Sequence, residues 1–419
     1  MSNHRNIIYS LLILSLLIGV ASGHALMFNI AYVLGGLLLL SLVWAQTGVS
    51  WVRARRLTRA RRAQVGKTLD EVFTVWNTGL VPKLWLEVLD HSTLPGHRAS
   101  HVVPSLFPRR QYRWETHTIC AMRGEFRLGP LTLVSGDPFG LFQISRHIGA
   151  TSRILIYPAT VPVHDFAVPI GLLPGGDAQR RRAHFVTTNA AGVRDYVPGD
   201  SFNRIHWPST ARKSRLLVKE FELDPLADVW IFLDLSARSL VERPGAREFE
   251  IADHDASFAL PPHLPPSTEE YAVVVAASLA KYFLDKGRNL GFLTYGPHRE
   301  IIQPDRSYRQ LDQVLELLAI ARSTPDMVLE QMLRLETDYL GRGTTLIIIT
   351  ADQTEGWVKE THVMARRGMR VVAVLLDPAS FGGPAGTLET QARLAALNIP
   401  TYIVRQGDDL TTILSRRQR

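Results

Sequence analysis

Residues capable of acid–base chemistry are most concentrated between Gly192 and Arg212, in the stretch GVRDYVPGDSFNRIHWPSTAR. A catalytic interpretation would make His206 a general base that a nearby aspartate, Asp195 or Asp200, orients. The serines of this stretch lie in no nucleophile-elbow motif, and the chain has neither an HExxH zinc motif nor a dinucleotide fingerprint. We therefore expect a structural cluster of charges that also shapes a partner surface, and not a catalytic site.

This interaction cluster is expected around a tight turn, because Pro198 presets φ and Gly199 tolerates a positive φ. Asp200 or Ser201 can cap a short helix that Pro208 ends, and a second short helix then leads to an apolar strand. Bidentate pairs between arginine and carboxylate fix side-chain geometry, so we expect the cluster to hold this loop against the following domain. Its expected members are Arg194, Asp195, Tyr196, Pro198, Gly199, Asp200, Arg204, His206, Trp207, Arg212, Lys219 and Glu220.

Oxygen-bearing side chains also follow two apolar runs in the second half of the chain. Asp234 and Ser236 end the run DVWIFLDLS, and Asp352 ends the run TTLIIITAD. Such runs are typical of buried parallel strands, and ligands of open α/β sheets bind outside the carboxyl ends of the strands. We therefore expect these three side chains to lie at a ligand-binding edge.

The elements that must position these residues alternate between apolar strands and amphipathic helices. One helix is expected from about Glu269 to Lys286, with Thr268 as its N-cap. This alternation predicts a mostly parallel sheet with helices on both faces. We assign residues 191–419, including the charged stretch, to this α/β domain.

Residues 69–160 show the alternation of β-strands instead. In QYRWETHTIC, Tyr112 and Trp114 fall on one face and Arg113 on the other. Short strands between Gly- and Pro-containing turns predict a small sandwich-like domain, and residues 161–190 should form a linker. The preceding Gly-Lys-Thr is not a phosphate-binding loop, because Arg61 occupies the position of the required first glycine.

The first 50 residues contain two uncharged apolar runs, 7–22 and 26–45. A bilayer core of about 30 Å needs roughly 17–25 apolar residues per helix, so we expect a transmembrane helical hairpin. A signal peptide is the alternative for the first run, although the second run would still anchor the chain. Arg5 precedes the pair and a basic segment follows it, which predicts that both ends lie in the cytoplasm.

The basic segment, residues 51–68, nearly accounts for the formal charge of +8. Because the excess is local, it favours contact with anionic lipid headgroups over nucleic-acid binding. The single cysteine, Cys120, excludes an intramolecular disulfide and fits a reducing compartment. The segment contains no acid, and its basic residues are Arg53, Arg55, Arg56, Arg59, Arg61, Arg62 and Lys67.

The sequence Asp-Leu-Ser after one apolar run, with an aspartate after another, resembles a von Willebrand factor A domain. The resemblance implies a Mg²⁺ site with an Asp-x-Ser-x-Ser signature, a threonine and a later aspartate. Here Arg238 stands at the third signature position, Ser239 is one place late, and Thr324 is only a candidate for the threonine. Alternatively, the first aspartate accepts bonds from loop N–H groups or pairs with Arg238. The implied, degenerate metal site consists of Asp234, Ser236 and Asp352.

The motifs RDYVPGD, RIHW and LLVKEFE resemble the family called domain of unknown function 58, as do RGEFRLGP, DPFGLF and the paired helices upstream. This resemblance covers nearly the whole chain. It implies a bacterial, membrane-anchored cytoplasmic protein, often encoded beside MoxR-type AAA ATPases and active in complex assembly or metal insertion.

Together these features predict a scaffold or adaptor, not an enzyme, in the inner (cytoplasmic) membrane with its soluble domains in the cytoplasm. We expect it to contact lipid through the hairpin and the basic segment, to bind a MoxR-type AAA ATPase, and to bind no nucleic acid. The alternative is a hydrolytic enzyme of the cell envelope with a site around His206, which would need the opposite topology.

Overall fold

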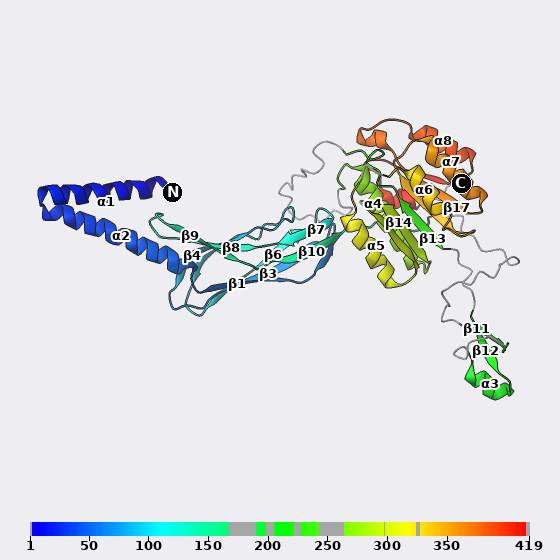
Figure 1. The fold of residues 1–419 in the computed structure, drawn as a ribbon, viewed down its shortest axis with the longest axis horizontal. Coiled ribbons are helices and arrows are strands. Elements are labelled where there is room, and N and C mark those ends of the chain that lie inside the picture. The colour runs from blue at the N-terminus through cyan, green and yellow to red at the C-terminus, as the bar shows by residue number, and fades with distance from the viewer. Residues whose placement is uncertain are drawn as a thin grey trace. The chain divides into compact units, whose positions relative to one another are not determined.

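The computed structural model describes residues 2–166, 190–197, 205–221, 228–242, 264–296, 298–323 and 327–415. Two compact units make up this part of the chain. The first contains two N-terminal helices and a β-rich region, and the second contains an α/β sheet (Figure 1).

Two long apolar helices begin the chain: α1 spans Ser2–Ser22 and α2 spans Ala25–Val49. Both are long and apolar enough to cross a membrane, and most of their side chains are exposed. The expected pair of apolar helices is therefore present. Helix α2 extends four residues beyond the expected end at Ala45, because its last turn packs against the β-rich region.

The β-rich region contains three sheets, with strand orders β1-β3-β6, β5-β4-β8-β9 and β2-β10-β7. Phe73 and Val75 of the first sheet share one core with Leu86 and Val103 of the second. All neighbours are antiparallel except β2 and β10. The strands are β1 Val52–Thr58, β2 Arg62–Gln64, β3 Thr68–Asn77, β4 Lys83–Asp90, β5 His101–Leu106, β6 Gln111–Ile119, β7 Gly124–Leu128, β8 Leu131–Gly136, β9 Gln143–Ile148 and β10 Ser152–Tyr157.

The basic segment differs from expectation, because most of it lies within the sheets. Strand β1 pairs with β3 from Val52 to Thr58, and Arg62 begins β2. Alternate side chains of β1 point inward, and the Arg56 side chain is only 3% exposed. The β-rich region therefore starts at Val52 and not at residue 69. A run of arginines obscured the strand, since backbone pairing depends little on side-chain charge.

The second unit contains a six-stranded sheet of order β15-β14-β13-β16-β17-β18. Five strands are parallel and β15 is antiparallel to β14, which confirms a mostly parallel sheet. Strand β15 was not expected, because its sequence, REIIQPD, is short and contains a proline. The strands are β13 Val229–Leu233, β14 Leu290–Tyr295, β15 Arg299–Asp305, β16 Thr345–Thr350, β17 Arg370–Leu376 and β18 Thr401–Val404.

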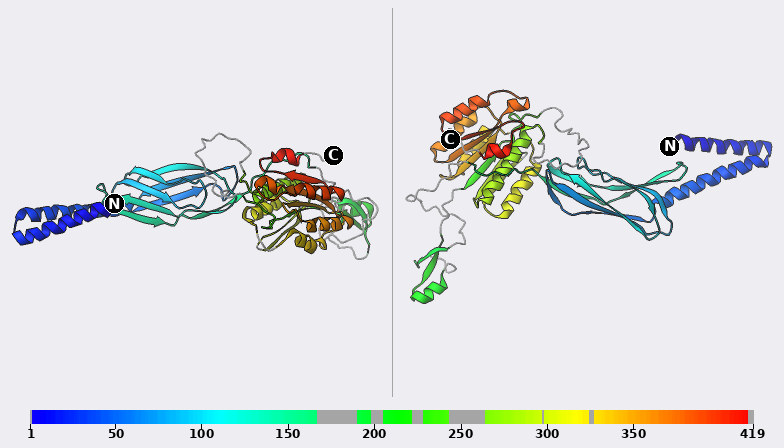
Figure 2. Two further views of the ribbon diagram at one scale, coloured as in Figure 1. Left: turned by 90° about the horizontal axis from the view of Figure 1, so that it is seen from above. Right: turned by 180° about the vertical axis from the view of Figure 1, so that it is seen from behind.

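Helices cover this sheet on both faces (Figures 1 and 2). Trp230 and Phe232 share one core with residues of α6, α7 and α8, whereas α4 packs against β13, β14, β16 and β17. Helix α4 begins at Thr268, and its N-cap is Ser267 instead of the expected Thr268. The helices are α4 Thr268–Asp285, α5 Tyr308–Ile320, α6 Leu329–Thr337, α7 Glu355–Arg366, a 3-10 turn Pro378–Phe381, α8 Thr387–Ala396 and α9 Leu410–Leu414.

The charged stretch contributes a separate hairpin: β11, Ala190–Asp195, pairs antiparallel with β12, Leu217–Phe221. Helix α3, Trp207–Lys213, lies between the two strands in sequence. The second short helix expected in this stretch is therefore present, and Pro208 lies in its first turn. A proline is tolerated there, since the first turn has no intrahelical partner for its missing N–H. Of the first expected helix, residues 202–207, residues 202–204 lie outside the described residues.

Candidate functional site

The first aspartate of the expected ligand edge, Asp234, directly follows β13 and is fully enclosed by its own loop and a neighbouring strand. Its Oδ1 accepts the Ser236 backbone N–H at 2.9 Å. Its Oδ2 accepts the hydroxyls of Ser239 at 3.0 Å and Thr350 at 2.6 Å. The side chain thus accepts three hydrogen bonds, two from hydroxyls and one from a backbone N–H. The Asp234 backbone N–H donates to Ile349 O.

The second aspartate, Asp352, follows β16 and is connected to Asp234 through a threonine. The Thr350 hydroxyl, which donates to Asp234, also accepts the Asp352 N–H at 2.8 Å. The Asp352 carboxylate accepts the backbone N–H and the hydroxyl of Thr354 at 2.8 and 3.1 Å. Thr350 was missed in the sequence, although it stands two residues before Asp352 in the same apolar run.

The sheet topology explains why these residues meet. Strands β13 and β16 are adjacent and parallel, with Leu233 opposite Ile349. From β13 the chain continues to β14 on one side, and β16 lies on the other side, so the strand order reverses between β13 and β16. Crevices at such a reversal, outside the carboxyl ends of the strands, are where open α/β sheets bind ligands.

Ser236 supplies an unsatisfied group to this edge. It is only 4% exposed, and its hydroxyl has no hydrogen-bond partner in the described part of the chain. A buried polar atom in this state is a candidate to bind a water molecule or an ion. Among the described residues Asp234 also forms no ion pair, and burial, together with the negative charge of Asp352, raises the pKa of Asp234 to about 6. The site therefore lacks positive charge.

Two kinds of partner were expected for Asp234 in the loop after β13, namely Arg238 and groups of the loop itself, and only the second kind is found in the described part of the chain. Arg238 is exposed and is not among the described partners of Asp234, so the expected pairing of these two residues is wrong. Ser239, one place after Arg238, donates its hydroxyl to Asp234, because the turn brings it back toward the end of β13. The bonds from loop groups to Asp234 are present as the alternative interpretation expected. Thr324 lies outside the described residues.

The interaction cluster is only partly described. Pro198, Gly199, Asp200 and Arg204 lie outside the described residues, and for Arg194, Lys219 and Glu220 only the strand pairing is described. Asp195 pairs with Arg215 at 3.2 Å, and both side chains are more than half exposed. The Tyr196 N–H bonds to Leu216 O, whereas Trp207 is 64% exposed and Arg212 lies in the last turn of α3.

His206 caps α3. Its Nδ1 accepts the Ser209 backbone N–H at 3.3 Å and lies 2.7 Å from the Ser209 hydroxyl. This geometry satisfies the first turn of the helix, as an N-cap side chain does. It also places a histidine beside a serine hydroxyl, an arrangement that fits a hydrolytic site.

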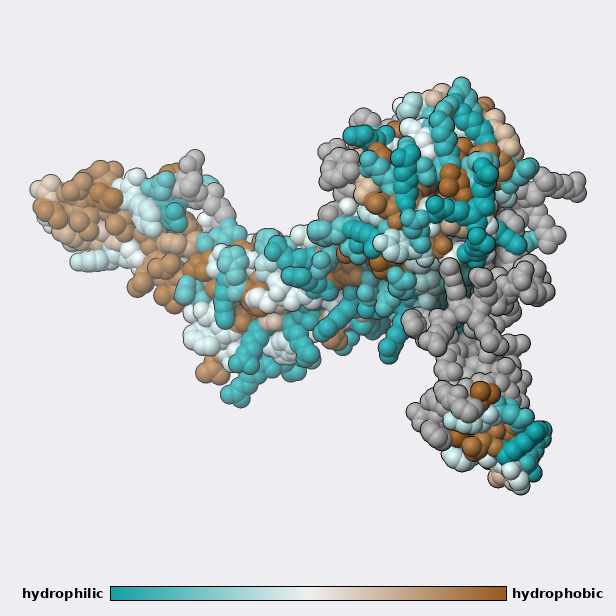
Figure 3. All heavy atoms as spheres, turned by 45° about the vertical axis from the view of Figure 1, so that its right-hand side comes forward, coloured by the Kyte–Doolittle hydropathy of each residue, from teal (hydrophilic) through white to brown (hydrophobic). Residues whose placement is uncertain are grey.

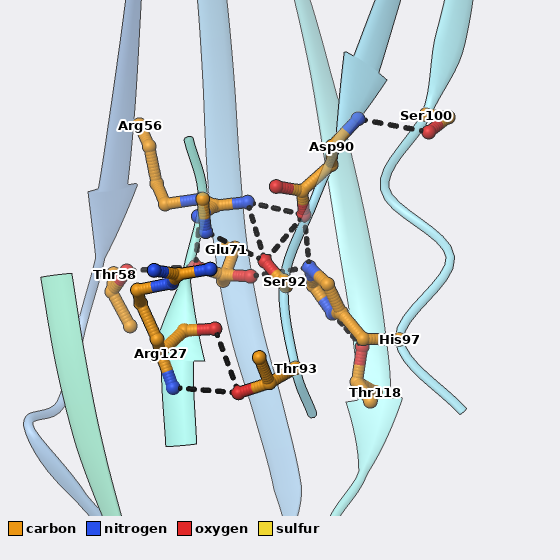
Figure 4. A network of polar contacts seen from close by, with 11 residues as sticks. Arg56, Thr58, Glu71, Asp90, Ser92, Thr93, His97, Ser100, Thr118 and Arg127 are labelled. Atoms are coloured by element: carbon orange, nitrogen blue, oxygen red, sulfur yellow. Dashed lines mark hydrogen bonds and ion pairs between the residues drawn. The ribbon is translucent and has the colours of Figure 1, made fainter. Parts of the chain in front are cut away.

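A further polar network, missed in the sequence, lies inside the β-rich region (Figure 4). Arg56 forms ion pairs with Glu71 and Asp90, and His97 Nε2 lies 3.1 Å from Glu71 and 2.9 Å from Asp90. All four side chains are at most 3% exposed. Hydroxyls extend the network: Thr58 donates to Glu71, Ser92 donates to Asp90, and Thr118 Oγ1 lies 2.8 Å from His97 Nδ1.

Unlike Asp234, the two carboxylates of this network face cationic partners from the chain itself. Burial alone would raise the pKa of Asp90. Hydrogen bonds from His97, Arg56 and Ser92 outweigh this effect and lower the pKa to about 2. Arg56 also lies 4.9 Å from the Phe73 ring centroid. No group of three or more His, Cys, Asp or Glu side chains in the described residues is arranged to hold a metal ion. We therefore assign the network to the stability of the β-rich region.

Comparison with known proteins gives one family and distant relatives. A family model described as protein of unknown function DUF58 matches residues 192–251. The protein of Bacillus subtilis described as uncharacterized protein YeaD is a distant homologue, 23% identical over 261 residues. The match covers 60% of this chain and 56% of YeaD, so the chain spans about half the length of that relative.

Solved structures resemble only parts of the chain. The CARDB domain of a Pyrococcus furiosus protein has a TM-score of 0.20 and 13% identity, and the match covers 25% of this chain and 86% of that domain. The pilus adhesin SpaC of Lactobacillus rhamnosus GG has a TM-score of 0.28 and 9% identity, and the match covers 45% of this chain and 28% of that adhesin. These scores are too low to support an argument about fold or function.

Proposed function

We propose that this chain, a member of the DUF58 family, is a membrane-anchored adaptor that binds a protein partner through a von Willebrand factor A-like module. In this proposal α1 and α2 span the inner membrane, with both soluble units in the cytoplasm, and the β-rich region is a sandwich-like spacer. The strand order and the single antiparallel strand β15 support the von Willebrand-like assignment.

The observation that carries the proposal is the arrangement around Asp234. Two carboxylates, those of Asp234 and Asp352, approach one edge of the sheet at the reversal of strand order, beside the unsatisfied hydroxyl of Ser236. A fully buried carboxylate without a cation is costly, so this edge favours binding of a positive ligand.

Magnesium fits this set of donors, because Mg²⁺ prefers oxygen ligands and the available groups are carboxylates and hydroxyls. Asp234, Ser236 and Asp352 would hold the ion, with Ser239 and Thr350 as additional hydroxyls around it. When bound, the ion would neutralise the carboxylates and attract an acidic side chain of the partner. The exposed Arg238 beside the loop would attract the same partner group.

The partner that we propose is a MoxR-type AAA ATPase, which the family resemblance implies. The test is to reconstitute the full chain in lipid nanodiscs, immobilise them, and measure binding of the purified ATPase with Mg²⁺ and ATP. The full chain is required because the last turn of α2 belongs to the core of the β-rich region. We expect Asp234→Ala and Ser236→Ala to weaken binding at least tenfold.

Asp338→Ala is the matched control, since Asp338 is a 77% exposed carboxylate paired with Arg367 in the same unit. Equal binding by Asp234→Ala and the wild type would leave an adaptor without a functional cation site. Lack of binding by the wild type would overturn the proposed partner.

The second candidate function is hydrolysis, which the 2.7 Å contact between His206 and the Ser209 hydroxyl favours. It would be supported if the full chain hydrolysed envelope material and Ser209→Ala abolished that activity. A control is Thr210→Ala, which removes the neighbouring hydroxyl of α3. A cytoplasmic location of both units would argue against this candidate.

A further inference from the structure

Large apolar side chains are exposed at one end of the β-rich region, the end at which α2 enters. The pairing registers place three loops there: Val52 lies opposite Asn77, Lys83 opposite Leu106, and β8 turns into β9 after Gly136. We call the loops 78–82, 107–110 and 137–142, with the junction at residues 50–51, the helix-side loops. Their exposed large apolar residues, with those of the adjoining start of β4, are Trp51, Leu80, Val81, Leu84, Trp85, Phe107 and Phe139.

These side chains contribute little to the core. Leu80 is 76% exposed, and Trp51, Phe107 and Phe139 are each more than half exposed. Figure 3 shows hydrophobic surface on the helices and again at the adjoining end of the β-rich region. Contiguous exposed apolar surface on a folded region marks a contact with another protein or with a membrane.

Buried polar side chains hold two of the loops in shape. Asn77, 1% exposed, donates to Val81 O at 2.8 Å and to Leu106 O at 3.1 Å, and it accepts the Gly79 N–H at 3.0 Å. It thus ties the first two helix-side loops together. Loops with this degree of internal bonding present their apolar tips as fixed features.

The third loop is built in a similar way. The carboxylate of Asp137, which is 7% exposed, accepts the backbone N–H groups of Phe139 and Phe142 at 2.9 and 2.6 Å. The Phe142 ring lies 5.8 Å from the guanidinium carbon of Arg5 in α1. The loop that carries Phe139 therefore lies beside the beginning of the first apolar helix.

The end of α2 is firmly attached to the same end of the β-rich region. Lys83 Nζ donates to Thr47 O at 2.5 Å, and Arg146 donates to Val49 O at 3.3 Å. Both cations satisfy carbonyls of the last helical turn, which have no intrahelical partner. Gly48 is required here, because a Cβ atom at this position would lie 2.5 Å from Ser135 Oγ.

The depth of the loops follows from the helix. Trp44 is the last exposed large apolar residue of α2, and at 1.5 Å per residue Trp51 lies about 10 Å further along the chain axis. The interfacial layer on each side of the hydrocarbon core is about 5–8 Å thick. A bilayer that covers α2 up to Trp44 therefore ends about 2–5 Å before Trp51, which is within the reach of large side chains on the helix-side loops.

We propose that the helix-side loops insert into the headgroup layer of the bilayer and fix the β-rich region against it. The inference rests on the proposed membrane anchoring by α1 and α2. Tryptophan and phenylalanine are suited to this layer, and the exposed Arg109 and Arg110 beside Phe107 offer positive charge to anionic headgroups. A lipid surface is favoured over a protein partner because the apolar loops adjoin the apolar helices.

The proposed lipid contact is therefore formed by the helix-side loops, and most of the basic segment, which was expected to contact lipid, lies away from it. Strand β1 starts at the helix side and leads away from it, so Thr58 lies about 20 Å beyond Val52. Arg59 and Arg61 follow at the far end, and Arg56 is buried in the ion network. Only the start of the segment, around Arg53, adjoins the helix-side loops.

Spin labels test the depth of each loop. The full chain is reconstituted in nanodiscs of phosphatidylcholine and phosphatidylglycerol in a Cys120→Ala background, which removes the one native thiol. Labels are attached in Phe107→Cys and Phe139→Cys, in Leu40→Cys within α2, and in Arg59→Cys at the far end. Each variant keeps the other apolar tips, and unfolding temperatures confirm that the labelled proteins are folded.

Collisions with a water-soluble nickel chelate and with oxygen, which partitions into lipid, report the depth. We expect the loop labels to collide with nickel several-fold less than the Arg59→Cys label and to lie between it and Leu40→Cys in oxygen access. Loop labels as accessible to nickel as Arg59→Cys, with Leu40→Cys in the hydrocarbon, would overturn the inference but leave the anchor. Nickel access at Leu40→Cys would overturn both.

Discussion

Asp90 and Asp234 are both buried aspartates, yet their surroundings act on them in opposite directions. Asp90 lies with Arg56, His97 and Ser92, and its pKa falls to about 2. Asp234 is bonded to two hydroxyls and a backbone N–H, with a second carboxylate nearby, and its pKa rises to about 6. Burial opposes ionisation in both places, so the difference comes from the partners.

The difference separates a structural role from a binding role. In the β-rich region the chain itself supplies Arg56 and His97 as partners of the buried carboxylates. At the edge of the α/β sheet no described residue forms an ion pair with Asp234. A buried carboxylate without a cation favours an external positive ligand, whereas one paired within the chain favours a structural role.

The largest effect on stability is expected from removing Arg56, the arginine of the ion network around Asp90. Arg56→Ala leaves Glu71 and Asp90 buried without their arginine, which should lower the free energy of unfolding by about 3–5 kcal/mol. Guanidinium unfolding followed by tryptophan fluorescence measures it. Arg113→Ala, which breaks an exposed pair with Glu115, is the control and should change stability little. A small effect of Arg56→Ala would erase the contrast between the two aspartates.

Magnesium bound at the Asp234 site should stabilise the α/β unit against unfolding. At an ion concentration 100-fold above its Kd, the wild type gains about 2.7 kcal/mol, which raises the unfolding temperature of the α/β unit by several degrees. Asp234→Ala should lose this gain, and Asp338→Ala should keep it. Differential scanning calorimetry with Mg²⁺ and with a chelator makes the measurement. An equal gain in Asp234→Ala would place the ion elsewhere.

Acid should reduce the stability that the ion network around Asp90 gives to the β-rich region. The pKa of Asp90 is lowered from 3.8 to about 2 in the folded protein, so its contribution is present above pH 3.8 and is lost as the pH falls toward 2. The shift corresponds to about 2 kcal/mol. Unfolding curves between pH 2 and 5 should show this slope in the wild type and a reduced slope in Asp90→Asn. Identical slopes would mean that Asp90 titrates normally.

The smallest effect is expected in the hairpin. Asp195 and Arg215 form an exposed pair, so Asp195→Ala should change the free energy of unfolding by less than about 1 kcal/mol. If the hairpin is a partner surface, the same variant should still weaken binding of the ATPase in the nanodisc assay. Full binding by Asp195→Ala would remove this residue from the proposed surface.

Several features were predictable because their signals are local. The length of the two uncharged apolar runs indicated α1 and α2, and period-two alternation indicated strands such as β6. Aspartates at the ends of apolar runs indicated the edge of the sheet where Asp234 and Asp352 lie. A short helix before the strand that contains Leu217 was also expected, but Trp207 was expected outside a helix and is the first residue of α3, because a proline both restricts the residue before it and favours the first turn of a helix. Local rules alone did not decide between these two effects.

The sequence by itself determined the classes of element and the placement of acidic residues at strand ends, since side-chain periodicity and strand direction are properties of the chain. Only the tertiary structure decided which residues become partners. Strand pairing brings Arg56, Glu71, Asp90 and His97 together, and a turn brings the Ser239 hydroxyl to Asp234. Burial and ion pairing depend on neighbours distant in sequence, so no local pattern specifies them.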